Sequence, residues 1–125
     1  MTLKVTGFSS GAATYKIVHD ADSITSGAPA LNENVTGASG RISSIEITNS
    51  AGTHTSYTKF KLTNGTVTVG TTEPDMMLVC GPNTSETYLF PAGLPFAQLT
   101  FWTTRDAATS DNTVPNSTVI NILCT

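Results

Sequence analysis

The sequence predicts a single all-β domain, built as a β-sandwich or jelly roll of about eight or nine short antiparallel strands. Short runs with apolar residues at alternate positions recur along the 125 residues, and turn-forming Gly, Pro and Asn separate them. No window of about eleven residues carries the i, i+3, i+4, i+7 apolar stripe of an amphipathic helix. The chain also holds 23 threonines, a residue type that favours extended strands.

The predicted strands follow one another with mostly short connections. They are Thr2–Thr6, Thr14–His19, Arg41–Asn49, Tyr57–Thr63, Thr66–Gly70, Met76–Cys80, Thr84–Phe90, Ala97–Thr104 and Thr118–Cys124. The segment MMLVC is apolar at every position. We therefore expect it to be a central strand or to lie under another subunit.

The segment YTKFKLT shows the pattern of a half-buried strand followed by a tight turn. Phe60 and Leu62 share one face, while the two lysines share the other. Asn64 and Gly65 follow directly, and both residue types tolerate the positive φ of a type I′ turn. The sequence therefore predicts a hairpin between this strand and the run at 66–70.

The aromatic segment LFPAGLPF predicts a corner between two strands. Phe90 would end one strand, because Pro91 and Pro95 cannot donate hydrogen bonds to a central ladder. Gly93 would turn the chain in a backbone conformation that residues with a side chain rarely adopt. Phe96 would then enter the core as the next strand begins.

Trp102 is the one tryptophan of the chain, and the alternation places it off the core face. In AQLTFWTT, Leu99 and Phe101 continue the core face, and Trp102 lies on the opposite side. Two interpretations remain open for it. Either a loop covers it, for which the polar segment 106–117 is the candidate, or a subunit contact buries it.

Residues 1–39 are poorer in core-forming residues than the remainder of the chain. The segment 20–40 is rich in Ser, Ala, Gly and Asn and predicts a long loop. The runs TLKVT and TYKIVH are either ordinary strands of the same sandwich or part of an arm. An arm would use Leu3, Val5 and Phe8 as apolar anchors on a partner and add a strand to its sheet.

The charge pattern argues against two classes of partner. Charged residues make up 12% of the chain, the net charge is -3, and the six Lys and Arg are scattered. We therefore expect no nucleic-acid partner. No apolar run approaches the roughly 20 residues of a membrane span, and the first residues show no secretory signal.

Cys80 and Cys124 both sit in apolar runs, which predicts two buried thiols. A disulfide between them is the alternative. Two cysteines in a chain without a secretory signal favour a reducing place of synthesis, and hence the free thiols.

The residue types of catalysis and metal binding are sparse. His19 and His54 are read most simply as exposed strand ends. Glu73 and Asp75 flank Pro74 and could form an acid–base pair or bind Ca²⁺, but a solvated loop before a strand is the simpler interpretation. The sequence holds no nucleophile, phosphate-loop or zinc-protease motif. We expect no enzyme activity, no catalytic residues, no metal and no cofactor.

Several pieces of the sequence, taken in order, resemble a family of small virion structural proteins of tailed bacteriophages. The resemblance covers about residues 40–124 and includes GRISSIEITN, YTKFKL, VGTTEPD, LFPAGLPF and LTFWTTRDAATSDN. The residues that carry it are Gly40, Arg41, Asn49, Tyr57, Lys59, Gly70, Thr71, Pro74, Pro91, Gly93 and Phe96.

This resemblance implies a capsid decoration, or cement, protein. Such a protein would be made in the host cytoplasm and would bind the major capsid protein on the surface of the assembled virion head. The resemblance further implies a compact β-sandwich that self-associates as a homotrimer. Under this hypothesis Leu3, Val5, Phe8 and Trp102 are the candidate contact residues.

Two alternatives to the decoration hypothesis stay open. The second hypothesis is a component of a phage tail or fibre, including a module that adheres to host carbohydrate. A cellular β-sandwich interaction domain is the third hypothesis. The position of the gene beside a capsid gene or a fibre gene would separate the first two.

Overall fold

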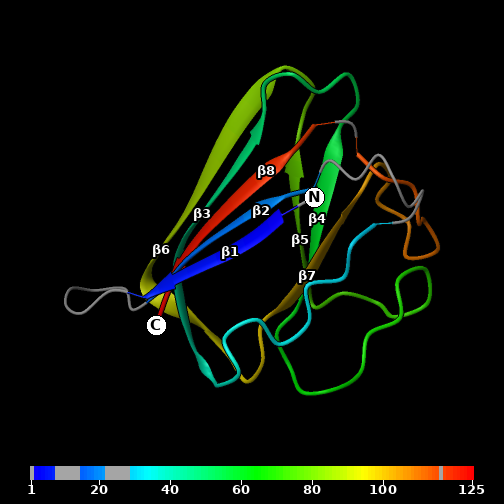
Figure 1. Ribbon diagram of the computed structural model, residues 1–125. Helices are drawn as coiled ribbons and strands as arrows, with labels where there is room; N and C mark the ends of the chain where they lie inside the picture. The colour runs from blue at the N-terminus through cyan, green and yellow to red at the C-terminus, as the bar shows by residue number, and fades with distance from the viewer. Residues whose placement is uncertain (1, 8–14, 22–28, 116) are drawn as a thin grey trace.

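Two antiparallel sheets of five and three strands face each other, and the described residues contain no helix. The computed structural model describes the chain except residues 1, 8–14, 22–28 and 116. The larger sheet has the order β1-β2-β8-β3-β6 and the smaller one β5-β4-β7, as Figure 1 shows. The strands are β1 (Thr2–Gly7), β2 (Tyr15–Asp20), β3 (Gly40–Asn49), β4 (Ser56–Lys61), β5 (Met76–Cys80), β6 (Thr84–Phe96), β7 (Thr100–Thr104) and β8 (Val119–Cys124). The predicted all-β class is therefore confirmed.

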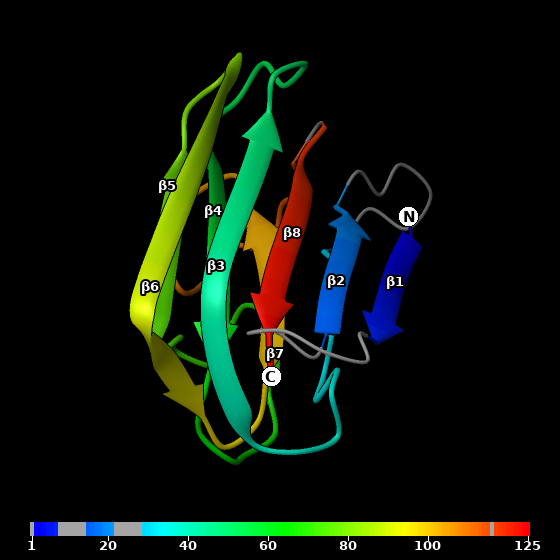
Figure 2. The same ribbon diagram turned by 90° about the vertical axis from the view of Figure 1, so that its left-hand side faces the viewer.

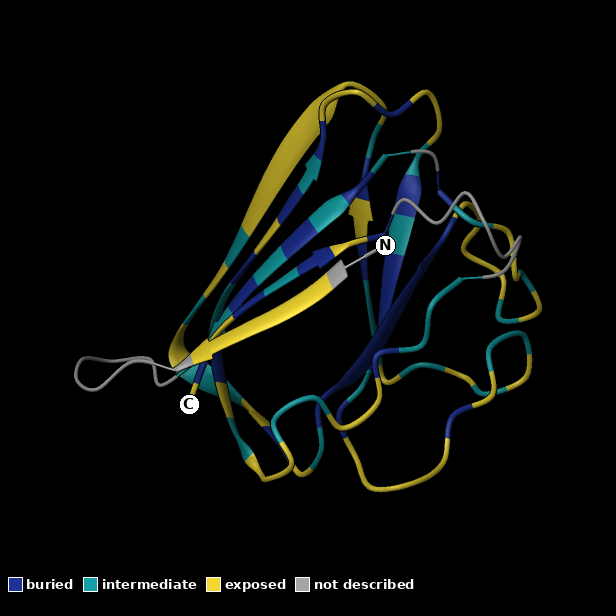
Figure 3. Ribbon diagram, viewed as in Figure 1, coloured by how far each residue is buried: buried dark blue, intermediate teal, exposed yellow. Residues whose placement is uncertain are grey.

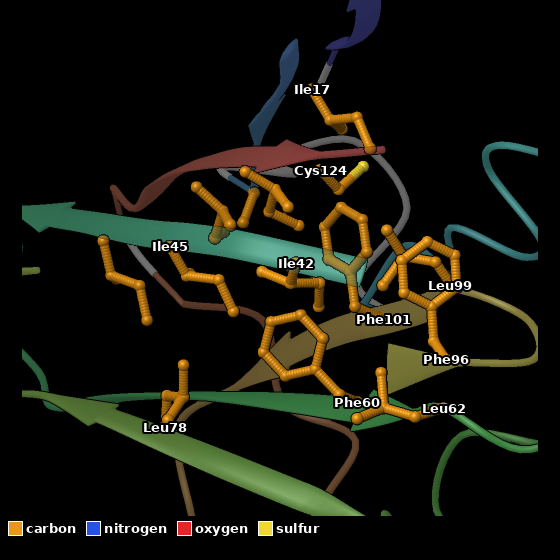
Figure 4. Close-up of a cluster of buried hydrophobic side chains, with 14 of the residues drawn as sticks. Ile17, Ile42, Ile45, Phe60, Leu62, Leu78, Phe96, Leu99, Phe101 and Cys124 are labelled. Carbon is orange, nitrogen blue, oxygen red and sulfur yellow. The ribbon is translucent and has the colours of Figure 1, made fainter. Parts of the chain in front are cut away.

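The core lies between the sheets and is formed by alternate residues of the strands. On the larger sheet, β3 and β8 contribute mainly isoleucines, and Figure 4 shows their side chains pointing toward the smaller sheet. From the other side Phe60 and Phe101 pack against each other, with ring centroids 5.8 Å apart. Leu99 is fully buried beside them, and Phe96 is 4% exposed. The core positions expected of Phe60, Leu62, Leu99 and Phe101 are thus observed, but the strand at 97–104 begins only at Thr100, and Lys59 and Trp102 on the opposite face are buried as well.

The two N-terminal runs are strands of the larger sheet. Strand β2 pairs with β8 and places Ile17 in the core. Strand β1 pairs with β2 at the sheet's edge, and Leu3 and Val5 remain 40% and 41% exposed. In Figure 3 the exposed strand β1 contrasts with the largely buried strand β7. Phe8 lies outside the described residues.

The hairpin expected at Asn64-Gly65 is not formed, and residues 66–70 are not a strand. Strand β4 is already paired on both sides, with β5 and with β7. Beyond its end, the backbone N–H groups of Leu62 and Thr63 donate to the carboxylate of Asp75 at 2.8 and 3.2 Å. Because these partners take the positions that a hairpin ladder needs, residues 66–70 form a loop.

Gly65 nevertheless adopts a φ of 146°, which β-branched residues rarely enter. Gly65→Val is therefore expected to lower the free energy of unfolding by about 1–2 kcal/mol through backbone strain. Steric collision is not the cause, because the nearest side-chain atom to an added Cβ is 4.0 Å away on Lys61. Urea denaturation measures the effect, with exposed Thr66→Val as control. Equal midpoints for the two variants would refute the strain.

The corner expected at Pro91–Pro95 is instead an interruption within one long strand, β6. Between the pairs Ile42–Leu94 and Ser44–Leu89, β3 has one residue, Ser43, whereas β6 has residues 90–93. This bulge and the edge position of β6 accommodate two prolines, because an edge strand has N–H groups that need no ladder partner. Figure 2 shows β6 bending in this half of the strand.

MMLVC is the edge strand β5, so the central-strand alternative is wrong, and Val79 is 41% exposed. Its other alternative, that another subunit covers this strand, stays a prediction. The expectation of an exposed strand end is wrong for His19, which is 2% exposed because it lies on the same inner face of β2 as Ile17. Its ring meets the Phe101 ring edge-on, with centroids 5.7 Å apart. His54 is exposed, as expected.

Cys80 and Cys124 are both buried and unpaired, so the free-thiol alternative holds. Burial raises the pKa of Cys124 to about 11, which keeps it protonated and unreactive at neutral pH. Ellman's reagent is therefore expected to react slowly with the native protein and to titrate both thiols after unfolding in urea. A thiol count of zero in urea without reductant would indicate a disulfide, and rapid reaction of the native protein would contradict the burial.

Candidate protein-interaction surface

The described residues contain no cluster of three or more His, Cys, Asp or Glu side chains that could hold a metal ion. Asp75, one of the two carboxylates singled out in the sequence, serves the fold. It accepts hydrogen bonds from the backbone of Leu62 and from the backbone and hydroxyl of Thr63. Burial acts to raise the pKa of Asp75, but these bonds and the Lys61 ammonium outweigh it, and the pKa is lowered.

Trp102 and Lys59 lie side by side on the outer face of the smaller sheet, where they pair across β7 and β4. Trp102 is 1% exposed and Lys59 is fully buried in the single chain. The Lys59 ammonium donates to the backbone oxygen of Ala108 at 2.8 Å, which ties residues 105–114 over this face. Of the two interpretations for Trp102, the structure favours cover by the chain's own loop.

The loop over Lys59 has its own internal bonds. The carboxylate of Asp111 accepts from the backbone of Asp106 at 2.8 Å and from the hydroxyl of Thr113 at 2.7 Å. Burial lowers the pKa of Lys59, and the negative charges of Asp111 and Asp106 partly counteract this. The Lys59 ammonium thus has a structural partner in the backbone of this loop.

Among the residues that the structure describes, the most exposed large apolar side chain is Leu89, at 71%. It pairs with Ser44, which pairs in turn with Leu123 on β8, so all three lie on the outer face of the larger sheet. Figure 2 views this face, with the bent strand β6 at one edge. Leu89 is therefore a large apolar side chain exposed to water on a bulged edge strand, which makes this edge a candidate contact surface.

Beside Leu89, the bulge borders an open hollow of about 440 Å³. It is lined by Arg41, Ser43, Leu89, Phe90, Pro91, Ala92, Gly93 and Thr125. Arg41 crosses Gly93, where an added Cβ would lie 3.0 Å from Arg41 carbons. Gly93 has a φ of 77° and carries no side chain, so it lets the arginine lie close to the strand. We call these eight residues the bulge surface.

No family model, curated protein or solved structure matches the chain. The bulge surface is therefore assessed on its own geometry. Among the described residues no helix is long and apolar enough to cross a membrane.

The structure separates the contact residues expected from the sequence. Leu3 and Val5 lie on β1, at the opposite edge of the larger sheet from the bulge surface, and Trp102 is buried within the single chain. Leu89 was not singled out in the sequence, although two prolines within an apolar run signal an irregular edge strand. Which side chains such a strand exposes depends on its register with β3, and the sequence pattern does not contain that register.

Proposed function

We propose that the chain is a structural protein of a tailed-phage virion, a decoration protein that binds the outside of the assembled head. Two things support this proposal. The order of sequence pieces over residues 40–124 resembles that family, and the exposed side chain of Leu89 on a bulged edge strand offers a surface for a protein partner. The exposed leucine is the observation that carries the proposal.

The binding is non-covalent and uses apolar and backbone contacts. Leu89 and the prolines of β6 dock on the major capsid protein, where burial replaces their exposure to water. Low charge suits this role, because apolar contacts are less sensitive to salt than exposed ion pairs. The edge strand β1, with Leu3 and Val5, is available for self-association into the proposed homotrimer, and repetition over the shell makes many weak contacts act together.

Leu89→Asp is expected to weaken binding to purified, undecorated heads by about 10- to 100-fold, since burying a leucine contributes roughly 1.5–3 kcal/mol. Co-sedimentation of the protein with heads measures this. Val79→Asp is the matched control, because Val79 is exposed on the other sheet, and it should bind like the unaltered protein.

Equal losses for both variants, or equal binding, would contradict a role for Leu89. Failure of the unaltered protein to bind heads, together with binding to tails or fibres, would support the tail or fibre alternative instead.

A further inference from the structure

Among the described residues, Arg41 in the bulge surface has no carboxylate partner. The ion pair among the described residues joins Lys61 and Asp75, on the other sheet. The Arg41 guanidinium instead donates weakly to two backbone oxygens, of Ala92 at 3.5 Å and of Gly93 at 3.3 Å. A guanidinium has five N–H donors in a planar fork, so most of its donor capacity remains for a partner.

The backbone around Arg41 is firmly held, which fixes where the side chain starts. Its N–H donates to the Thr125 hydroxyl at 2.8 Å, and its carbonyl accepts from the Thr125 N–H at 2.9 Å. The side chain then lies across Gly93, as described above. An exposed cation is thereby held against the apolar residues of the bulge rather than extended freely into water.

We propose that the bulge surface binds a partner segment in which a carboxylate stands next to an apolar side chain. The carboxylate accepts two parallel hydrogen bonds from Arg41, and the apolar side chain packs on Leu89 and Pro91. This deepens the proposed function, on which it rests for the identity of the partner, by stating the chemistry of the capsid segment that is bound.

Charge and geometry together favour this occupant. Bidentate pairing with a carboxylate is the contact that a guanidinium forms best, and the adjoining apolar surface excludes water from it. A partner segment bearing Lys or Arg would be repelled at this position. The chain as a whole carries a net charge of -3 and repels acidic peptides in general, so binding of a carboxylate requires Arg41 itself.

Short peptides test this chemistry without any phage component. The probes are N-acetyl-Leu-Glu-Leu-amide and its Gln counterpart, titrated into the ¹⁵N-labelled full chain and followed by two-dimensional NMR. The Glu peptide is expected to shift the Arg41 Nε–H signal and the backbone signals of residues 89–93 in a saturable way. The Gln peptide should bind at least about 10-fold more weakly, a difference of roughly 1.4 kcal/mol.

Two variants complete the test. Arg41→Gln keeps the backbone pairing with Thr125 and should remove the preference for the Glu peptide over the Gln peptide. Arg41→Lys should retain only part of this preference, because lysine lacks the planar fork.

Equal binding of both peptides, shifts elsewhere on the chain, or a preference that persists in Arg41→Gln would overturn the proposal. Peptide binding without head binding would contradict the decoration function alone, and head binding that is unchanged in Arg41→Gln would contradict the carboxylate contact alone.

Discussion

Asn49→Asp is expected to lower the free energy of unfolding by about 3–4 kcal/mol, one of the largest effects of any isosteric substitution in this chain. Asn49 ends β3 and is 1% exposed. Its amide nitrogen donates to the backbone oxygens of His54, Gly81 and Cys80, at 2.8, 3.0 and 3.3 Å. The amide thereby links the end of the larger sheet to the end of β5 in the smaller one.

The loss follows from replacing a donor with an acceptor. An aspartate oxygen in place of the amide nitrogen would face three carbonyl oxygens in a buried position, with no proton to share and a charge to desolvate. The side-chain oxygen of Asn49 also accepts from the Thr118 hydroxyl at 3.2 Å, a bond that aspartate can keep. The amide group therefore accounts for the expected difference.

Urea denaturation of Asn49→Asp measures this, with exposed Asn64→Asp as the control for one added negative charge. The control should change stability by less than about 0.5 kcal/mol. A loss below about 1 kcal/mol in Asn49→Asp would show that the amide does not connect the sheets, because a buried donor left without its partner costs at least that much.

Phe101→Ala should destabilise the fold by roughly 3–5 kcal/mol, as a large core truncation. The side chain is fully buried, stacks on Phe60 and meets the edge of His19. The substitution removes contacts to both sheets and leaves a cavity that the paired strands β4 and β7 cannot close by moving.

Thermal and urea unfolding of Phe101→Ala can be compared with Trp102→Ala and Leu89→Ala. Because Trp102 is covered by its own chain, Trp102→Ala should also lose stability without a change in oligomer size. Leu89→Ala should lose little stability. A smaller oligomer for Trp102→Ala at unchanged stability would instead place Trp102 in a subunit contact.

The sequence pattern predicts where the strands lie in the chain better than it predicts which strands pair with one another. Alternation identified the core faces around Phe60 and Phe101, because the period of a strand is visible in the sequence. The hairpin after Asn64 was wrong because β4 pairs with β5, which follows only after the loop of residues 62–75, and with β7, which lies further along the chain; local turn chemistry cannot reveal such partners. His19 was misplaced because it lies on the inner face of β2, whose cover comes from residues distant in the chain.

Residues that carry the family resemblance mostly hold the fold. Asn49 links the sheets, Lys59 ties down a loop, and Phe96 fills the core. At Gly40 an added Cβ would collide with the Phe96 ring and with the backbone of Thr125. Such residues predict an architecture rather than a partner. Arg41, Pro91 and Gly93 differ from these, because they lie in the bulge surface.

Electron cryo-microscopy of undecorated heads saturated with the purified protein tests the central proposal most directly. We expect added density on the outside of the shell, arranged around threefold positions, with residues 89–93 of β6 against the major capsid protein. Heads that show no added density at saturating protein, or density confined to the tail, would contradict a decoration function.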